Sequence, residues 1–384
     1  MKSLFKLKYL LLYLVSIQSY AQTKQVFQKV LPVDAKTEAI FNLKNTTVLI
    51  EPSTDGKMHF NYEVNFENYS KKEIKTVLEK ISVTAEKFEN TITLVSKNIT
   101  KTPKVAFHYK AENGLTMTDD LFGFKSKDSL KVYRKSKDSL IRMMNDNPLK
   151  NFFDKFKELD DNGNPRRISK KNVKIIRSTF VIKVPPYVPL TIKGIDTQIT
   201  FADNIQNEIQ LDVKRGFLRA EVLANKGNYI KVRDATCRIE TVLGGNFIFN
   251  NVKSGILGSV NHATIDSEFS DIEIGVIGKG SRIKDFNSTY WFYNFTDNFE
   301  RFNVLAEYSK LNLFYPETDY KLSAIGHNTV HYIGGHKITM QPNREGEKFK
   351  MMERKPKTDT PSGHIDLDIV HGVLYTSDEF IIEN

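Results

Sequence analysis

The 384-residue sequence contains a single cysteine, Cys237. One cysteine forms no internal disulfide, so stability has to come from a core, which a chain of this length is ample to build. Cys237 lies in the alternating run ATCRIETVL, which predicts a buried thiol rather than a nucleophile. The sequence also lacks a glycine-rich phosphate loop, a nucleophile elbow and a paired-cysteine site. We therefore predict no catalytic residue, no cofactor and no metal.

Long apolar runs are scarce, and the one that exists lies at the N-terminus. Residues 1–21 combine three early lysines, an apolar run from Tyr9 to Ile17 and a small-residue site ending at Ala21. This order is typical of a secretory signal peptide, so we expect export and cleavage after Ala21. The run is shorter than the roughly 20 residues of a membrane helix, which disfavours the alternative of an uncleaved anchor. Without a transmembrane span, the mature chain is expected in the periplasm, at the outer cell surface or outside the cell.

The positive charge is unevenly distributed. The formal net charge is +10, and residues 101–174 hold eighteen Lys and Arg against ten Asp and Glu. We interpret 101–172 as a basic insert, partly helical (130–144 and 152–159) and partly mobile. Because the charge is confined to this insert of an exported protein, an anionic envelope surface is a better partner than nucleic acid. A solvated loop without a partner is the alternative. The candidate contact residues are Lys125, Lys127, Lys131, Arg134, Lys135 and Lys137.

Residues 22–100 are predicted to form an N-terminal β segment interrupted by one helix. Alternating apolar residues on both sides of the turn PSTDG indicate strands. In SKKEIKTVLEKI, Ile74, Val77, Leu78 and Ile81 follow helical spacing. Ser70 and Glu73 have the spacing of a capping box, so we expect a short amphipathic helix to begin there.

A repeated unit of two short strands fills residues 173–340, most clearly from Pro189 onward. Most blocks are 18 or 19 residues long, and none predicts a helix. This pattern favours an all-β fold, a parallel β-helix or β-solenoid with coils of about 18 residues stacked at about 4.8 Å. An antiparallel sandwich is the alternative. Residues 341–384 are predicted to be a loop and strands that cap the rod. The predicted inward residues are Leu218, Ala220, Val222, Ile239, Ile256, Ile272, Ile274, Val276, Leu311 and Leu313.

Three stretches resemble a known family. NTTVLIEPSTDGKMHFNYEV is similar to its opening coil, FVIKVPPYVPLTIKG to its I-x-V-P-x-x-x-x-L-x-I segment, and FSDIEIGVIG to its G-D-I-x-I rung, with Ser270 in the glycine position. The chain resembles the putative-adhesin β-solenoid proteins, exported by bacteria and notably by Bacteroidetes. The resemblance covers about 36–98 and 173–340. It implies a β-helix and brings no catalytic residues with it.

Polar candidates for chemistry are few. His327 and His331 have the even spacing that places side chains on one face of a strand, with His336 close by. His364, Asp366 and Asp368 share the same pattern, but no spacing matches a metal motif, so exposed turn and strand residues are the simpler interpretation. Asp203, Asp212 and Asp234 lie in early coils, yet they occupy different positions of their blocks, and hydrolysis would require carboxylates about 5–10 Å apart.

Aromatic residues concentrate in STYWFYNF. Alternate residues of a strand face opposite sides, so some of these rings are expected to point outward. An outward stack of rings would bind a sugar or a protein partner. The alternative is that the insert or the C-terminal segment covers this face. The candidate ligand-face residues are Tyr290, Trp291, Phe292, Tyr293 and Phe295.

These observations together predict an exported, non-enzymatic β-solenoid that acts in surface adhesion, interaction or envelope scaffolding. Its expected partners are a surface glycan, an anionic envelope surface or another envelope protein. Two alternatives remain. One is a carbohydrate-active β-helix enzyme, and the other is an envelope signalling accessory that uses the basic insert.

Overall fold

The computed structural model describes residues 21–101, 105–110, 116–120, 157–159, 165–167, 173–333, 336–340 and 350–377. The predicted signal peptide lies outside this range except for Ala21. The six basic candidates between Lys125 and Lys137 also lie outside the described residues.

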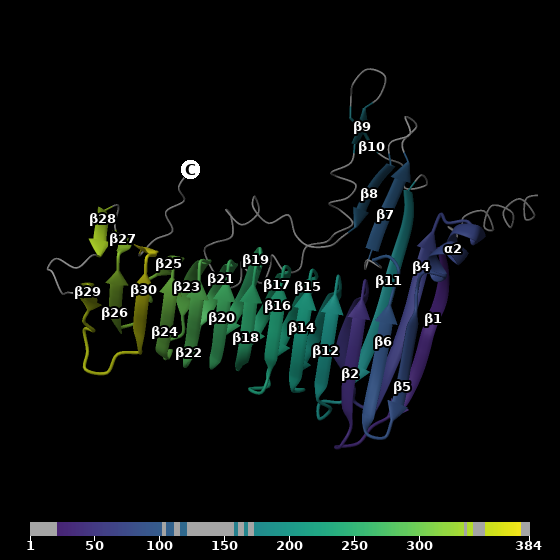
Figure 1. The fold of residues 1–384 in the computed structure, drawn as a ribbon, viewed down its shortest axis with the longest axis horizontal. Helices are drawn as coiled ribbons and strands as arrows, with labels where there is room; N and C mark the ends of the chain where they lie inside the picture. The colour runs from purple at the N-terminus through teal and green to yellow at the C-terminus, as the bar shows by residue number, and fades with distance from the viewer. Residues whose placement is uncertain are drawn as a thin grey trace, which may run out of the picture.

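Two long sheets lie face to face and form a rod (Figure 1). Sheet A has sixteen strands and sheet B has thirteen. Along the rod, sheet A runs β1 (Ala21–Pro32), β4 (Lys57–Glu67), β11 (Val173–Val184), β3 (Thr47–Pro52), β13 (Gln198–Ile205), β15 (Phe217–Leu223), β17 (Thr236–Val242), β19 (Ser254–Val260), β21 (Asp271–Ile277), β23 (Thr289–Phe295), β25 (Lys310–Phe314), β31 (Val373–Ser377), β27 (Thr329–Ile333) and β28 (His336–Met340). Sheet B, in the same direction, runs β5 (Val83–Phe88), β6 (Thr91–Lys97), β2 (Glu38–Lys44), β12 (Leu190–Ile195), β14 (Ile209–Lys214), β16 (Tyr229–Arg233), β18 (Gly245–Asn250), β20 (Ala263–Glu268), β22 (Ser281–Phe286), β24 (Glu300–Glu307), β30 (Gly363–Val370), β26 (Tyr320–His327) and β29 (Lys350–Arg354).

From β12 to β25, successive strands of the chain alternate between the two sheets and pair in parallel with their equivalents in the next coil. Ile265 of β20, for example, pairs with Phe247 of β18 on one side and with Ile283 of β22 on the other. These residues are buried, because each apolar row inside sheet B faces the apolar rows of sheet A. The predicted β-rich architecture is confirmed as two long, largely parallel sheets. The antiparallel-sandwich alternative is wrong, because the stack in the middle of the rod is parallel.

The strict alternation expected in sheet A breaks once in each of several strands. In β15 the adjacent residues Glu221 and Val222 are both half-buried, and in β21 the half-buried Val276 interrupts the alternation between the buried Ile274 and Ile277. Ile256 is buried, but it belongs to a separate cluster with Tyr293 instead of the central core. These three predicted core positions are therefore wrong, and the inward residue at the end of β21 is Ile277.

The corner from sheet B to sheet A has the same backbone geometry in nearly every coil. Its first residue has a positive φ, a conformation that Asn and Asp tolerate better than other non-glycine residues. In several coils the next residue is Ser or Thr, and its hydroxyl donates to the carbonyl oxygen two residues earlier. Such pairs are Asn45 with Thr46, Asp196 with Thr197, Phe269 with Ser270, and Tyr308 with Ser309.

Both ends of the rod contain a coil that is out of chain order. At the N-terminal end, Phe41 of β2 pairs with Ile192 of β12 and with Leu94 of β6, so the first coil lies between two later ones. At the other end, Ile365 of β30 pairs with Phe302 of β24 and with Leu322 of β26. The C-terminal strands β30 and β31 thus lie inside the stack and do not cap it. The terminal strands β28 and β29 are antiparallel additions.

The predicted helix is confirmed as α2 (Lys71–Leu78). Ser70 and Glu73 form the capping box, and Ile74 is the buried residue of the helix. The basic insert departs from expectation, because β7 (Val105–Lys110) joins sheet A by antiparallel pairing with β11, and β8 (Thr116–Asp120) pairs with β7. The last residues of the predicted helix 152–159 form β9 (Lys157–Leu159), which pairs with β10 (Pro165–Arg167).

Candidate binding groove on sheet B

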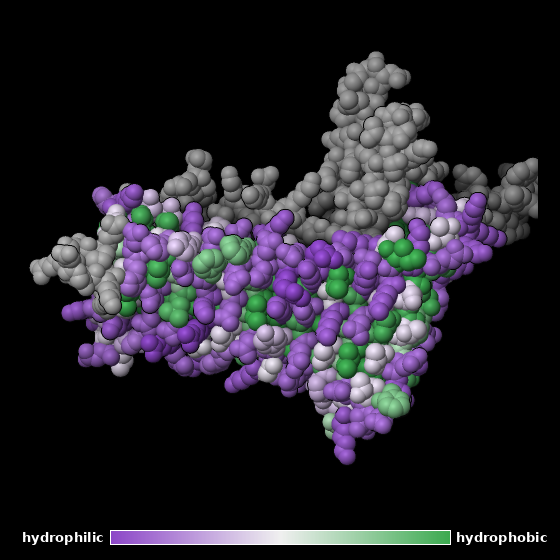
Figure 2. Space-filling model, in the orientation of Figure 1, coloured by the Kyte–Doolittle hydropathy of each residue, from purple (hydrophilic) through white to green (hydrophobic). Residues whose placement is uncertain are grey.

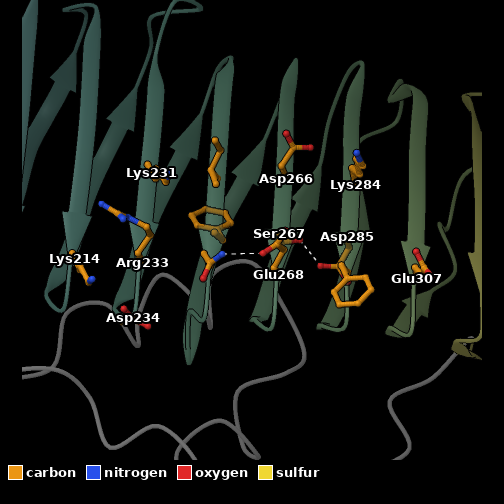
Figure 3. Close-up of a pocket in the computed structure, with 14 residues that line it drawn as sticks. Lys214, Lys231, Arg233, Asp234, Asp266, Ser267, Glu268, Lys284, Asp285 and Glu307 are labelled. Atoms are coloured by element: carbon orange, nitrogen blue, oxygen red, sulfur yellow. Dashed lines mark hydrogen bonds between the residues drawn. The ribbon is translucent and has the colours of Figure 1, made fainter.

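A shallow groove of about 780 Å³ lies on the outer side of sheet B, across strands β14 to β24 (Figure 3). Parallel pairing in register places one residue from each coil in a row along the rod. One row runs through Asp212, Lys231, Ile248, Asp266 and Lys284. The next row contains Lys214, Arg233, Asn250, Glu268, Phe286 and Glu307. The register of the solenoid therefore brings residues far apart in sequence into continuous, largely polar rows.

Several groove side chains form hydrogen bonds with side chains of a neighbouring coil. Arg233 donates to both carboxylate oxygens of Asp212, with Nη2 2.7 Å from each. Such a bidentate pair has fixed geometry, although its exposure keeps its energetic contribution small. Asn250 Nδ2 donates to Glu268 Oε2 at 3.0 Å. These contacts orient the polar groups at one end of the groove.

Beneath the groove, a buried carboxylate interrupts the apolar core. Asp285 is 5% exposed and accepts hydrogen bonds from Ser267 Oγ and Ser309 Oγ, both at 2.5 Å, and from the Ser288 amide at 3.2 Å. The hydroxyl oxygen of Tyr290 lies 2.6 Å from Ser267 Oγ. Burial and then the charge of Asp285 raise the pKa of Tyr290 well above its usual range, so this phenol stays protonated. The network links the coils of β20, β22 and β24.

The predicted aromatic ligand face is divided between the two sides of sheet A. Tyr290 and Phe292 are fully buried in the core and stack on each other at 5.3 Å, so they cannot line an outer surface. Phe295 is half-buried and packs against that same core. Trp291 and Tyr293 belong to the outer cluster with Ile256 and Phe314. Tyr293 is only 6% exposed, and its hydroxyl donates to Glu273 at 2.7 Å.

The histidine candidates do not converge. His327 ends β26, whereas His331 lies on β27 after the corner residue Asn328. His331 is buried and hydrogen-bonds to Thr376, while His336 is exposed on β28. The prediction that His327 and His331 share a face is therefore wrong, because a corner separates them. In the part of the chain that the structure describes, no group of three or more His, Cys, Asp or Glu residues is placed to hold a metal ion.

The acidic candidates have separate surroundings. Asp366 accepts from Arg301 at 2.9 Å, and Asp368 lies 3.9 Å from His327; His364 is exposed beside them on β30. Asp212 is held by Arg233, as described above. Asp234 accepts from Asn251 at 2.8 Å, and Asp203 lies on β13 in the opposite sheet.

Sequence reasoning did not identify the groove residues as a group. These residues come from different blocks, and taken singly each resembles any other outward-facing strand residue: Lys214, Arg233, Glu268 and Glu307. The signal that connects them is the corner residue that follows each one, because it fixes the register. Aligning the coils on those corners, rather than on the start of each block, would have placed these side chains in one row.

Comparisons with known proteins give two solved structures. No protein-family model and no curated protein matches the sequence. A structure described as "a putative cell adhesion protein" from Clostridium sporogenes covers 93% of this chain and 98% of its own, with 12% identity and a TM-score of 0.18. Another, described as "a putative adhesin" from Bacteroides fragilis, covers 94% of this chain and 100% of its own, with 10% identity and a TM-score of 0.30. Such low superposition scores leave the function to be argued from the chain's own geometry.

Proposed function

We propose that this chain is a non-enzymatic, exported β-solenoid that acts in surface adhesion, interaction or envelope scaffolding. The observation that carries this proposal is the rigid rod itself, whose parallel register arranges outward side chains into long rows. Such rows suit the binding of an extended partner. Coils of about 18 residues, as the sequence blocks predict, would repeat each position along the rod.

The ends of the rod support a role carried by its faces. Antiparallel strands terminate both sheets, with β1 and β5 at one end and β28 and β29 at the other. An exposed parallel edge would invite the addition of another chain, and irregular terminal strands reduce that tendency. Contacts through the outward rows are therefore favoured over edge-to-edge polymerisation. Among the described residues, no helix has the length and apolarity to span a membrane.

The test is a binding panel of immobilised polysaccharides and of vesicles containing phosphatidylglycerol, at low and high ionic strength. The mature chain 22–384 is compared with a variant in which Lys125, Lys127, Lys131, Arg134, Lys135 and Lys137 are all glutamine. We expect polysaccharide binding that resists salt and survives these substitutions, because the rod face makes the contact. Vesicle binding that disappears with high salt or with the six substitutions would instead support the envelope accessory. Absence of polysaccharide binding would overturn the adhesion role, and release of reducing sugar ends would overturn its non-enzymatic character.

A further inference from the structure

Aromatic side chains form a ladder along the corner beside the sheet B groove. Phe286 ends β22, while Phe269 and Tyr308 are the corner residues that follow β20 and β24. The ring centroids of Phe269 and Phe286 lie 5.6 Å apart, and those of Phe286 and Tyr308 lie 5.8 Å apart. Tyr308 also stacks on the corner residue His371, at 5.2 Å. The aromatic ladder, defined as Phe269, Phe286, Tyr308 and His371, therefore crosses β20, β22, β24 and β30.

The rings of the ladder are open to solvent. Phe269 is 53% exposed, Tyr308 is 52% exposed and Phe286 is 37% exposed. Large apolar side chains that gather on a surface mark a binding site more often than isolated ones do. The face of the rod seen in Figure 2 is largely hydrophilic, with hydrophobic residues scattered over it. Charged and amide side chains line the groove next to Phe286, among them Arg233, Glu268 and Glu307, so the ladder is an apolar strip beside a polar surface.

Three of the four ladder residues, Phe269, Tyr308 and His371, have a positive φ, which is less unusual for histidine than for the other two. Phe269 has φ 50° and Tyr308 has φ 55°, in the left-handed region that is unfavourable for bulky residues. Equivalent corners use Asn251, Asn287 and Asn328, which adopt that conformation at lower cost. Strained conformations of this kind gather at functional sites. An aromatic residue that is both strained and exposed contributes little to folding, so binding is the better reason for its presence.

The polar groups beside the ladder indicate the chemistry of the partner. Phe286 pairs with Glu268 on one side and with Glu307 on the other, so carboxylates flank the exposed ring. Apart from the buried Asp285, the groove is lined by four basic and four acidic side chains. Charges of both signs in similar number give no strong field for a polyanion or a polycation. A neutral ligand with many hydroxyl groups fits this lining better.

We propose that the aromatic ladder binds a neutral polysaccharide that lies along the rod axis. Pyranose rings have an apolar face of C–H groups, which stacks on aromatic side chains, and an edge of hydroxyls, which donate to carboxylates. The ladder supplies the apolar platform, while Glu268, Glu307 and Asn250 supply hydrogen-bonding groups in the adjacent groove. The inference rests on the proposed role in surface interaction and assigns the binding site to the ladder.

The test measures affinity of the mature chain for soluble neutral polysaccharides: β-glucan, xylan, mannan and chitin oligosaccharides. The variants are Phe269→Asn, Tyr308→Asn and their combination, which install the residue found at equivalent corners. We expect each substitution to weaken binding roughly tenfold, as the loss of a ring contact of about 1.4 kcal/mol would. The melting temperature should stay equal or rise, because strain is relieved. Phe88→Asn is the matched control, since Phe88 is 76% exposed on β5, away from the ladder, and its substitution should leave affinity unchanged.

Three results would overturn the proposal, in distinguishable ways. If the double variant binds polysaccharide as tightly as the parent chain, the ladder is not the binding site, and the adhesion role is unaffected. A parent chain that binds no neutral polysaccharide but binds a charged polysaccharide of the first panel would overturn the ladder proposal and leave the adhesion role, whereas no binding to any polysaccharide would overturn both. If the variants lose binding only because their melting temperature falls, the rings stabilise the corner and do not bind the ligand. In that case Phe286→Leu, which keeps an apolar side chain, would retain affinity.

Discussion

Asp285 shows how a single polar residue is accommodated in a solenoid core. It occupies an inward position of β22, where equivalent strands hold Phe249 and Ser267. Among the described residues it forms no ion pair, and three donors share its two oxygens instead. A buried carboxylate without this set of donors would be strongly unfavourable. The network therefore specifies which coils are neighbours as well as filling the core.

We predict that Asp285→Ala lowers the free energy of unfolding by about 3 kcal/mol or more, because it leaves the Ser267 hydroxyl, the Ser309 hydroxyl and the Ser288 amide without their acceptor. Asp285→Asn should cost less, since its carbonyl oxygen still accepts. Urea unfolding followed by circular dichroism measures the difference. Equal stability of the alanine variant and the parent would mean that the network contributes nothing.

His331 predicts a dependence of stability on pH. It is 1% exposed, and burial lowers its pKa from the ordinary 6.5. The unfolded chain then binds a proton at a higher pH than the folded chain does, so stability should fall as the pH drops below about 6.5. Melting temperatures measured between pH 7 and pH 5 test this. His331→Gln preserves a partner for Thr376 and should flatten the profile; an unchanged slope would exclude His331 as the cause.

At the scale of elements, the sequence predicted a helix or strand correctly where its structure depends mainly on its own residues. The capping box at Ser70 and the apolar stripe around Ile74 predicted α2, because a short helix is fixed by its own caps and spacing. Strands with clear alternation, such as β4, were equally readable. The errors arose at corners and at strand ends. A positive φ at Asn328 separates His327 from His331, and an interruption of the alternation near the end of β21 leaves Val276 half-buried.

The candidate site was less predictable than its elements, for the same reason. Aromatic density pointed to 290–295, where Tyr290 and Phe292 fill the core. The ladder rings come from three blocks and from the C-terminal segment, and they come together only through register. Composition within a window detects neighbours in sequence, whereas a solenoid makes neighbours of residues one coil apart. Corner residues carry that information, because Phe269 and Tyr308 stand where other coils have Asn.

Near each end of the whole molecule, one coil is inserted into the stack out of chain order. The first coil, β2 and β3, lies between the coil of β6 and β11 and the coil of β12 and β13. The last strands in sequence, β30 and β31, lie between β24 and β25 on one side and β26 and β27 on the other. An ordinary solenoid frays from its last repeat, because each coil contacts only its neighbours. Here the outermost coils are tied to the stack by a segment distant in sequence.

This topology predicts how the rod responds to truncation. A chain ending at 340 loses the inserted coil, including the buried residues Ile365, Leu367, Ile369 and Leu374. Their burial contributes on the order of 6 kcal/mol or more, and β26 and β27 would lose their parallel partners in the stack. Hydrogen exchange should therefore show lost protection in β26 and β27 and weakened protection in β24 and β25. Protection in β14 to β17 should persist, because stability in a stacked solenoid is local.

A synthetic peptide of residues 360–377 should restore the lost protection in the truncated chain, because it supplies the missing coil. Full protection of β26 and β27 in the truncated chain would show instead that they pair directly with β24 and β25, and that the inserted coil is not what holds this end of the rod.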